Sequence, residues 1–448
     1  MSPESLTIHP PPIAWRHLLH HNTSPQATQL RRELDLPTDR PIIMTGHQPE
    51  FWHPGILAKY LAADAASAAL NACPVWLFVD QDRPDSVPLH FPAVGNAITT
   101  ERPALSVGTL TIRERTPPTS PRDPAPLVAA QLATLLSTLA RHHSAPTLSH
   151  QIAATLADLA RPYLALPHPT IFATQLSRTT LFRELVAQMA RDPERCIRTY
   201  NAAAARHPSA NIRPLTASDI QDRWELPLWH LPPHRPRTHV YAEDLPAIPP
   251  HELAPKALFM TGLLRLAACD LFIHGTGGAG STDVSPPPDA HDGYDLITEE
   301  WFRDWLGQPL APMTLVTATR YLPLADGPIP TPADLARARW LAHHARHSPL
   351  LLRDPDAALA KQHIVDQIEL LPRHTRARAD LFRRLHAALA DYRQQHSPEL
   401  SSLSTSAAET AAQLAQRDIL FNRTWPFPLY PDPVLSSLRD DVRRSFGQ

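Results

Sequence analysis

The chain has 448 residues, of which 42 are Lys or Arg and 44 are Asp or Glu, so its formal net charge at pH 7 is −2. This balance argues against binding of nucleic acid or of an anionic membrane by bulk charge. The length allows two or three domains, and a hydrophobic content of 43% supports real cores. The 51 prolines are scattered, which indicates rigid loops and helix starts.

The three cysteines, Cys73, Cys196 and Cys269, form no CxxC pair and lie beside apolar residues. We interpret them as small buried hydrophobes rather than as a disulfide framework or a zinc site. The N-terminus lacks a basic-then-apolar signal pattern, and no stretch approaches the length of a membrane span. We therefore expect a cytoplasmic protein that acts on a small-molecule substrate, without nucleic-acid or membrane partners.

In chain order, Ser24-Pro25 is a helix start, and residues 41–82 contain the strongest pattern. Apolar runs at 42–44 and 74–79 predict two strands, and a periodic segment from Pro54 predicts a helix between them. This order is a βαβ unit, and in open α/β sheets the ligand crevice lies at the carboxyl ends of the strands. Six polar side chains fall at or near such ends: His47, Gln48, His53, Lys59, Asp80 and Asp82.

Lysine is rare in this chain: only Lys59, Lys256 and Lys361 occur among the 42 basic residues. A chain that uses Arg for most cations retains Lys where a compact ammonium group is needed. Lys59 is therefore a candidate site residue, and the alternative is a solvated helix residue.

The middle of the chain divides by pattern. Residues 1–125 are assigned to the first part of a core, 126–199 to a helical insertion, and 200–330 to the second part of the core. A strand is expected at 109–113, and residues 224–229 suggest another.

A second polar centre follows a predicted helix at 255–268 and a predicted strand at 270–274. His274 ends that strand, and Gly275, Gly277, Gly278 and Gly280 come next, four of only 13 glycines. Such a loop cradles an anion with its N–H groups, or it is a tight surface loop. A helix is predicted from an N-cap at Thr298, with Asp295 either in the site or capping this helix. Arg320 follows a strand at 313–318.

Residues 331–448 are predicted to be helical, with N-caps at Thr331 and Ser406 and an apolar stripe over 381–392. This region reads as a short coiled-coil arm, which is compatible with a homodimer. The aromatic segment 423–428 is expected to dock back on the core.

The turn Thr45-Gly46-His47-Gln48-Pro49, with Lys59 and the run 75–82, resembles the bacillithiol biosynthesis cysteine-adding enzyme family, as do Arg423 and Phe427 near the end. This resemblance implies a Rossmann-like parallel-sheet core, helical peripheral elements and a C-terminal coiled coil. His47 stands where that family has Gln, and His53 extends the turn. The turn also resembles the start of WbqC-like proteins, which are thought to act in sugar-polymer synthesis.

Three functional hypotheses follow. The first is a transferase or ligase that joins an amine or thiol to a small acidic or sugar-containing substrate. His47 and His53 would bind an anion, Asp80 or Asp82 would act as a base, His274 and the glycines would close the site, and Arg320 would pair with a carboxylate. A loose likeness to the HxGH turn of nucleotidyl-transfer enzymes leaves a nucleotide, ATP or ADP, open as cofactor.

The second hypothesis is a metal-dependent hydrolase or transferase that uses the same His and Asp side chains, although no HExxH or HxH spacing occurs. The third is a non-catalytic relative that keeps the fold as a small-molecule-binding module, which the His47 change allows.

Overall fold

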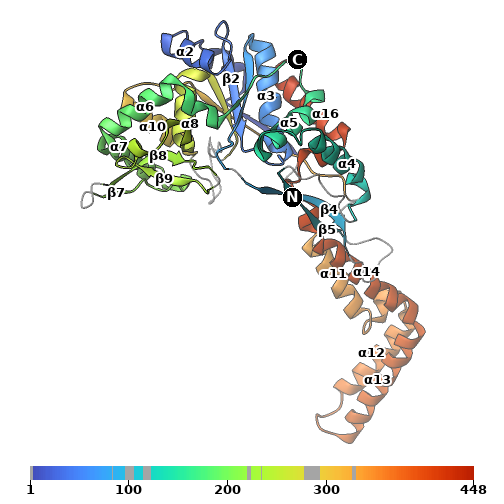
Figure 1. The fold of residues 1–448 in the computed structure, drawn as a ribbon. Helices are drawn as coiled ribbons and strands as arrows, with labels where there is room; N and C mark the ends of the chain where they lie inside the picture. Colours follow the sequence, from blue (N-terminus) through green and yellow to red (C-terminus); the bar gives the residue numbers. More distant parts are fainter. Residues whose placement is uncertain are drawn as a thin grey trace. The chain divides into compact units, whose positions relative to one another are not determined.

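The computed structural model describes residues 4–82, 84–95, 105–114, 123–218, 223–233, 235–276, 293–324 and 329–448. The chain divides into two units (Figure 1). The first consists of Met1–Phe91, Gly108–Leu322 and Arg423–Gln448, and the second of Pro92–Val107 and Pro323–Asn422. The segment 126–199 is therefore part of the first unit, as are the last 26 residues of the predicted helical arm. In the described ranges, no helix is both long and apolar enough to cross a membrane.

A six-stranded sheet organises the first unit. Its spatial order is β1 (Ser5–His9), β12 (Met313–Thr319), β11 (Leu271–His274), β2 (Ile42–His47), β3 (Cys73–Phe78), β6 (Thr170–Phe172). Only β1 is antiparallel to its neighbour, and the other pairs are parallel. The predicted α/β class is confirmed, with a mostly parallel sheet. The four strands predicted from apolar runs are confirmed, whereas the edge strands β1 and β6 were not predicted.

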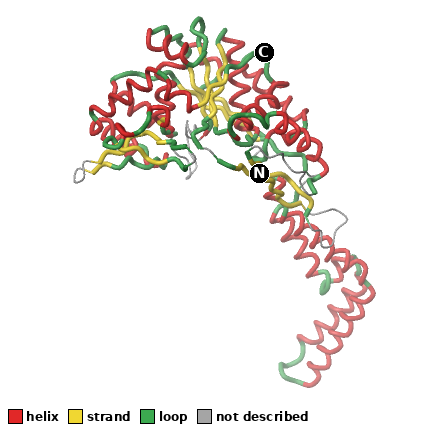
Figure 2. Tube along the Cα trace, viewed as in Figure 1, coloured by secondary structure: helices red, strands yellow, loops and turns green. Residues whose placement is uncertain are grey.

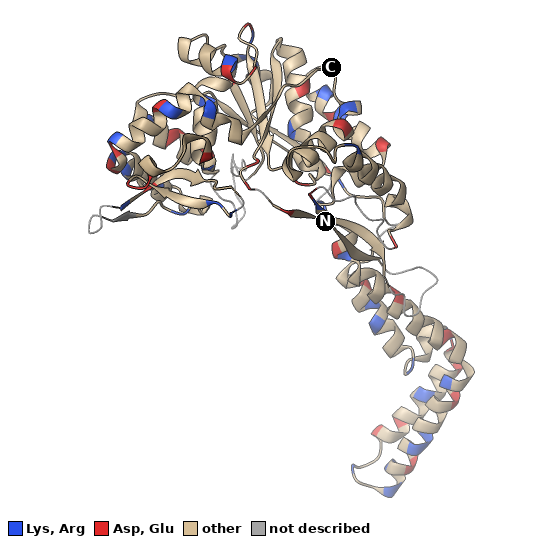
Figure 3. Ribbon diagram, viewed as in Figure 1, with Lys and Arg blue, Asp and Glu red and all other residues tan. Residues whose placement is uncertain are grey.

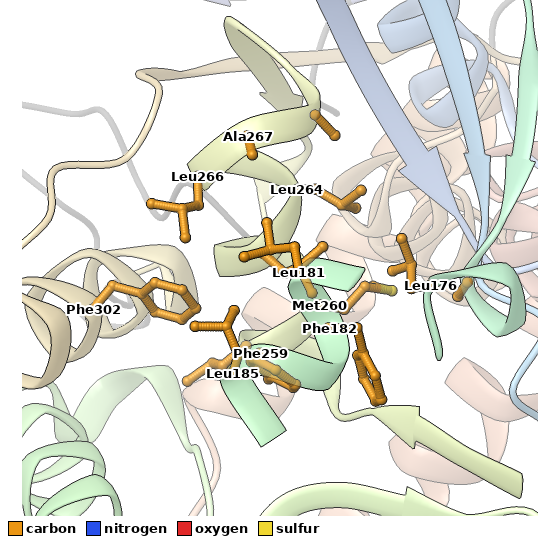
Figure 4. Packing of buried hydrophobic residues seen from close by; sticks show 14 of the residues in the cluster. Leu176, Leu181, Phe182, Leu185, Phe259, Met260, Leu264, Leu266, Ala267 and Phe302 are labelled. Atoms are coloured by element: carbon orange, nitrogen blue, oxygen red, sulfur yellow. The ribbon is translucent and has the colours of Figure 1, made fainter. Parts of the chain in front are cut away.

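Alternation along the strands divides their side chains between two faces. Ile42, Met44, Val75 and Leu77 belong to one hydrophobic core, and Figure 4 shows part of its packing. The helices that supply this core are α2 (Pro25–Glu33), α6 (Thr180–Arg191), α7 (Pro193–Arg206), α8 (Ala257–Leu263) and α10 (Tyr294–Leu306). A π-helical turn at Leu264–Ala268 continues α8.

The opposite face packs against α3 (Pro54–Leu70), which contacts β2, β3 and β12. Rings stack between the two layers: Trp52 lies 4.3 Å from Tyr60 and 5.3 Å from Phe78 between centroids. The other helices of this unit are α1 (Pro12–Leu18), α4 (Pro126–Arg141), α5 (Leu148–Ala160) and α16 (Asp432–Ser445), of which α16 packs on α3.

A smaller antiparallel sheet contains the strand predicted at 224–229, which is confirmed as part of β8 (Arg223–His230). It has the order β10 (Leu253–Pro255), β8, β7 (Ala217–Ser218), and β9 (Thr238–Tyr241) also pairs with β8. A separate hairpin joins β4 (Ser86–Val94) and β5 (Leu105–Arg113), which confirms the predicted strand at 109–113. Figure 2 shows these strands in yellow.

The described part of the second unit is mainly helical: α11 (Pro332–His344), α12 (Pro355–Glu369), α13 (Arg376–Gln395), α14 (Ser397–Ala415) and α15 (Arg417–Leu420). Helix α11 packs on α14, and α12 on α13. Acidic and basic residues are both scattered over the helices of this unit (Figure 3). The cap at Thr331 is confirmed as a capping box with Asp334. The cap predicted at Ser406 is wrong, because α14 runs through it.

The aromatic segment near the C-terminus docks on the first unit, as predicted. Trp425 and Phe427 are 1% and 0% exposed, and the backbone N–H of Phe427 donates to the Trp52 carbonyl at 2.5 Å. Trp52 is itself fully buried, as expected. All three cysteines are free and buried, which confirms their reading as small core residues.

Candidate functional site

The order of the parallel strands creates a switch point between β2 and β11. From β2 the chain adds β3 and then β6 on one side, and later β11 and β12 on the other. Connections that diverge in this way leave a crevice at the carboxyl ends of the two central strands. His47 is the last residue of β2, and His274 is the last residue of β11. The sequence analysis placed both at strand ends.

The side chain of Lys59 reaches from α3 to this switch point. It is 4% exposed, and its ammonium group donates to the carbonyl of Gly46 in β2 at 2.8 Å. A Cβ on Gly275, just past β11, would lie 3.8 Å from Lys59 Cδ. The side chain therefore lies close to the ends of both central strands.

No carboxylate in the described parts of the chain forms an ion pair with Lys59. Burial lowers the pKa of its ammonium group from 10.5 to about 7. A buried ammonium group with one hydrogen bond and no counterion is costly, because it retains only part of the solvation it has in water. An anionic ligand at this place would supply the missing partner.

His53 forms the N-cap of α3, and its Nδ1 accepts from the backbone N–H of Gly55 at 3.1 Å. That bond assigns the neutral tautomer with its proton on Nε2. Burial, together with the positive charges of Arg423 and Lys59, lowers the pKa of His53 to about 4. At neutral pH His53 is thus an uncharged N–H donor at the start of a helix, where the helix dipole also favours an anion.

His47 is partly buried, with Nδ1 3.4 Å from the Gln48 carbonyl and 3.4 Å from a Glu50 carboxylate oxygen. Burial and then the charge of Lys59 lower the pKa of His47 to about 3. Gln48 is exposed, and its carbonyl accepts from the Trp52 indole at 2.8 Å. Gln48 thus shapes the turn through its backbone carbonyl.

His274 is oriented by a buried ionic chain. Its Nε2 lies 2.7 Å from Asp295 Oδ2, and the same oxygen accepts from Arg265 Nη1 at 2.5 Å. Burial by itself would raise the pKa of Asp295, but the charges of His274 and Arg265 lower it to about 2. Arg265 also donates to Glu299 and to the Ala311 carbonyl. An ionised carboxylate that fixes an imidazole ring is the arrangement of a positioned general base.

Sequence reasoning placed the start of this helix incorrectly. α10 begins at Tyr294, so Asp295 is in its first turn and the predicted cap, Thr298, is inside the helix. Arg265 was missed altogether. Its only signal in the sequence was a charged residue within the otherwise apolar segment 257–268.

The two aspartates after β3 have structural partners. Asp80 accepts from the backbone N–H of Thr174 at 2.9 Å and from its hydroxyl group at 2.6 Å, which ties β3 to the short 3-10 helix at Ala173–Arg178. Asp82 is exposed and pairs with Arg237 at 2.8 Å. Neither geometry places a carboxylate at the β2–β11 switch point, so we do not assign Asp80 or Asp82 a catalytic role there.

Arg320 follows β12 and is 4% exposed. It donates to the carbonyls of Ser5 and Thr319 at 3.1 and 3.0 Å and pairs with Asp441 of α16. Its charge is therefore already neutralised within the protein. Gly277 and Gly278, which were expected to line the site, lie outside the described residues.

In the described segments, no group of three or more His, Cys, Asp or Glu side chains is arranged to hold a metal ion. The chain matches no protein-family model, and a comparison with curated proteins found no match.

Proposed function

We propose that this protein is a transferase or ligase that joins an amine or thiol to a small acidic or sugar-containing substrate at the β2–β11 switch point. One observation carries the proposal: the buried ammonium group of Lys59 donates to the Gly46 carbonyl, next to His47, and has no carboxylate partner among the described residues. Such an environment favours an oxyanion, either a carboxylate or a phosphate.

The roles of the side chains follow from their positions. Lys59, with the Nε2–H group of His53 at the start of α3, would hold the anionic group and stabilise charge that develops on a departing oxygen. His274, oriented by Asp295, would take the proton from the attacking amine or thiol. The nucleophile then forms the new bond, and the leaving group departs with the electron pair of the bond that breaks.

Two coarser likenesses support this proposal. The parallel strand order β6-β3-β2-β11-β12 is compatible with a Rossmann-like core, and the paired helices of the second unit are compatible with a short coiled-coil arm. Both agree with the resemblance to the bacillithiol cysteine-adding enzymes. A nucleotide, ATP or ADP, would supply a suitable anionic group, and the WbqC-like resemblance keeps sugar substrates in the same class.

The test is a thermal-shift screen of the full chain with ATP, ADP, AMP, amino-sugar conjugates, and Mg²⁺, Mn²⁺ and Zn²⁺. A ligand at 100 times its Kd stabilises the native state by about 2.7 kcal/mol. We expect a nucleotide or amino sugar to raise Tm, and His47→Ala and Lys59→Met to remove the shift.

Lys361→Met is the matched control, because Lys361 lies on α12 and its exposed ammonium group binds only the His347 carbonyl among the described residues. A shift that survives Lys59→Met would contradict the proposal. A shift with metal alone would favour the hydrolase hypothesis, and binding without turnover would favour the binding module.

A further inference from the structure

A second group of cationic side chains lies on the smaller sheet, and the proposed reaction does not use it. We call it the Lys256 cluster. It contains Arg213, Arg237, His239 and Lys256, which surround the carboxylate of Glu225 and the ring of Trp229.

The carboxylate of Glu225 carries one negative charge and is surrounded by more than one positively charged side chain. Its side chain is 1% exposed, and Oε1 lies 2.5 Å from Lys256 Nζ and 2.9 Å from His239 Nδ1. The same oxygen pairs with Arg213, while Oε2 accepts from the backbone N–H of Thr216 at 3.0 Å. One buried carboxylate thus faces an ammonium group, a guanidinium group and an imidazole.

Arg237 adds a third cationic side chain. Its guanidinium carbon lies 4.4 Å from the centroid of the Trp229 ring, and Lys256 Nζ lies 4.8 Å from the same centroid. The partner of Arg237 is Asp82, which is 59% exposed. An exposed ion pair contributes little to stability, so a ligand can replace Asp82 as that partner.

The cluster lies at the same edge of the large sheet as the β2–β11 switch point. The amide Nε2 of Gln81, just beyond β3, donates to the Pro255 carbonyl at 2.6 Å, and Lys256 is the next residue. The backbone N–H of Val79 donates to the His47 carbonyl at 3.0 Å. The end of β3 thus connects the turn that carries His47 with the segment that carries Lys256.

We propose that the Lys256 cluster is a second anion subsite, in which Lys256, Arg237 and His239 bind a carboxylate or a phosphate. This subsite extends the proposed function and rests on it, because both sites would bind one substrate. That substrate would carry two separate acidic groups, one for each site. The positions of the lysines in the sequence agree with two anion sites. Of the three lysines in an arginine-rich chain, the two with largely buried side chains are Lys59 and Lys256, one in each site.

The test is calorimetric titration of the full chain with inorganic phosphate and, separately, with succinate, at constant ionic strength. We expect two binding events in the wild type. Arg237→Gln should weaken one of them at least tenfold and leave the fold intact, because Arg237 is exposed on the surface. Lys256→Met should weaken the same event. Arg235→Gln removes an equal charge two residues away, from a side chain outside the cluster, and should leave both events unchanged.

Each outcome is decisive. The subsite is wrong if both events survive Arg237→Gln and Lys256→Met, or if the wild type shows a single event that Lys59→Met abolishes. If Lys59→Met changes nothing while Arg237→Gln removes an event, the subsite stands and the anion site of the proposed function fails. Tighter binding of phosphate or of succinate identifies the oxyanion as a phosphate ester or a carboxylate.

Discussion

At the scale of single residues, burial makes the ammonium group of Lys59 easier to deprotonate than it is in water. With the pKa of Lys59 at about 7 against 10.5 in the unfolded chain, the unfolded state binds more protons between these values. The stability of the ligand-free protein should therefore rise with pH across this window. An anion that binds Lys59 favours the charged ammonium group and therefore raises the pKa of Lys59 part of the way back.

Binding of inorganic phosphate or a nucleotide at pH 7.5 should therefore be accompanied by proton uptake, and affinity should fall as pH rises above about 7. Calorimetry in two buffers with different ionisation enthalpies measures the uptake. His47 and His53 contribute little at this pH, because their pKa values, about 3 and about 4, lie far below it. Uptake that persists unchanged in Lys59→Met would contradict the assignment.

At the scale of elements, the position of α3 depends on a glycine at its second residue. A Cβ on Gly55 would lie 2.6 Å from the backbone carbonyl oxygen of Ala318 in β12, closer than any real Cβ contact. The helix start, which carries His53, thus approaches the sheet more closely than any other residue type would allow.

We expect Gly55→Ala to lower the free energy of unfolding by about 1–3 kcal/mol, because helix and strand must move apart. Gly275→Ala is the control, since its Cβ would make an ordinary contact with Lys59 Cδ at 3.8 Å. Urea denaturation of both variants measures the difference. Equal stability of the two variants would show that α3 adjusts without cost.

The elements that could be predicted from the sequence are determined by residues close together in the chain. Apolar runs predicted β2, β3, β11 and β12, and Ser24-Pro25 predicted the start of α2, because these signals act within a few residues. The roles of Asp80 and Asp295 could not be predicted in this way. Their partners, Thr174 and Arg265, lie 94 and 30 residues away, and only the folded chain brings them together.

At the scale of the whole molecule, the last residues of the chain support the turn that carries the candidate site. The backbone N–H of Phe427 donates to the Trp52 carbonyl, and the Trp52 indole donates to the Gln48 carbonyl beside His47. The turn is therefore held in place by a residue 375 positions further along the chain (427 minus 52).

Phe427→Ala should lower the free energy of unfolding of the first unit by about 3–5 kcal/mol, since it empties a fully buried aromatic position. It should also weaken anion binding, because the turn loses its support. Trp340→Ala, at a 51% exposed position on α11, is the control and should stay within about 0.5 kcal/mol. Denaturation followed by tryptophan fluorescence, together with phosphate titration, tests both statements. A Phe427→Ala variant as stable as Trp340→Ala would show that the aromatic segment is dispensable.

The division of the first unit into three stretches of chain has a consequence for biosynthesis. The ribosome makes residues 1–322, then about a hundred residues of the second unit, and only then Arg423–Gln448, which completes the first unit. Domains generally fold as they emerge, in order from the N-terminus. Here the parallel sheet is made before Arg423–Gln448, the segment that covers α3 and supports the turn before it. During translation the first unit therefore stays incomplete, and exposed to proteases and chaperones, until Arg423–Gln448 has been made.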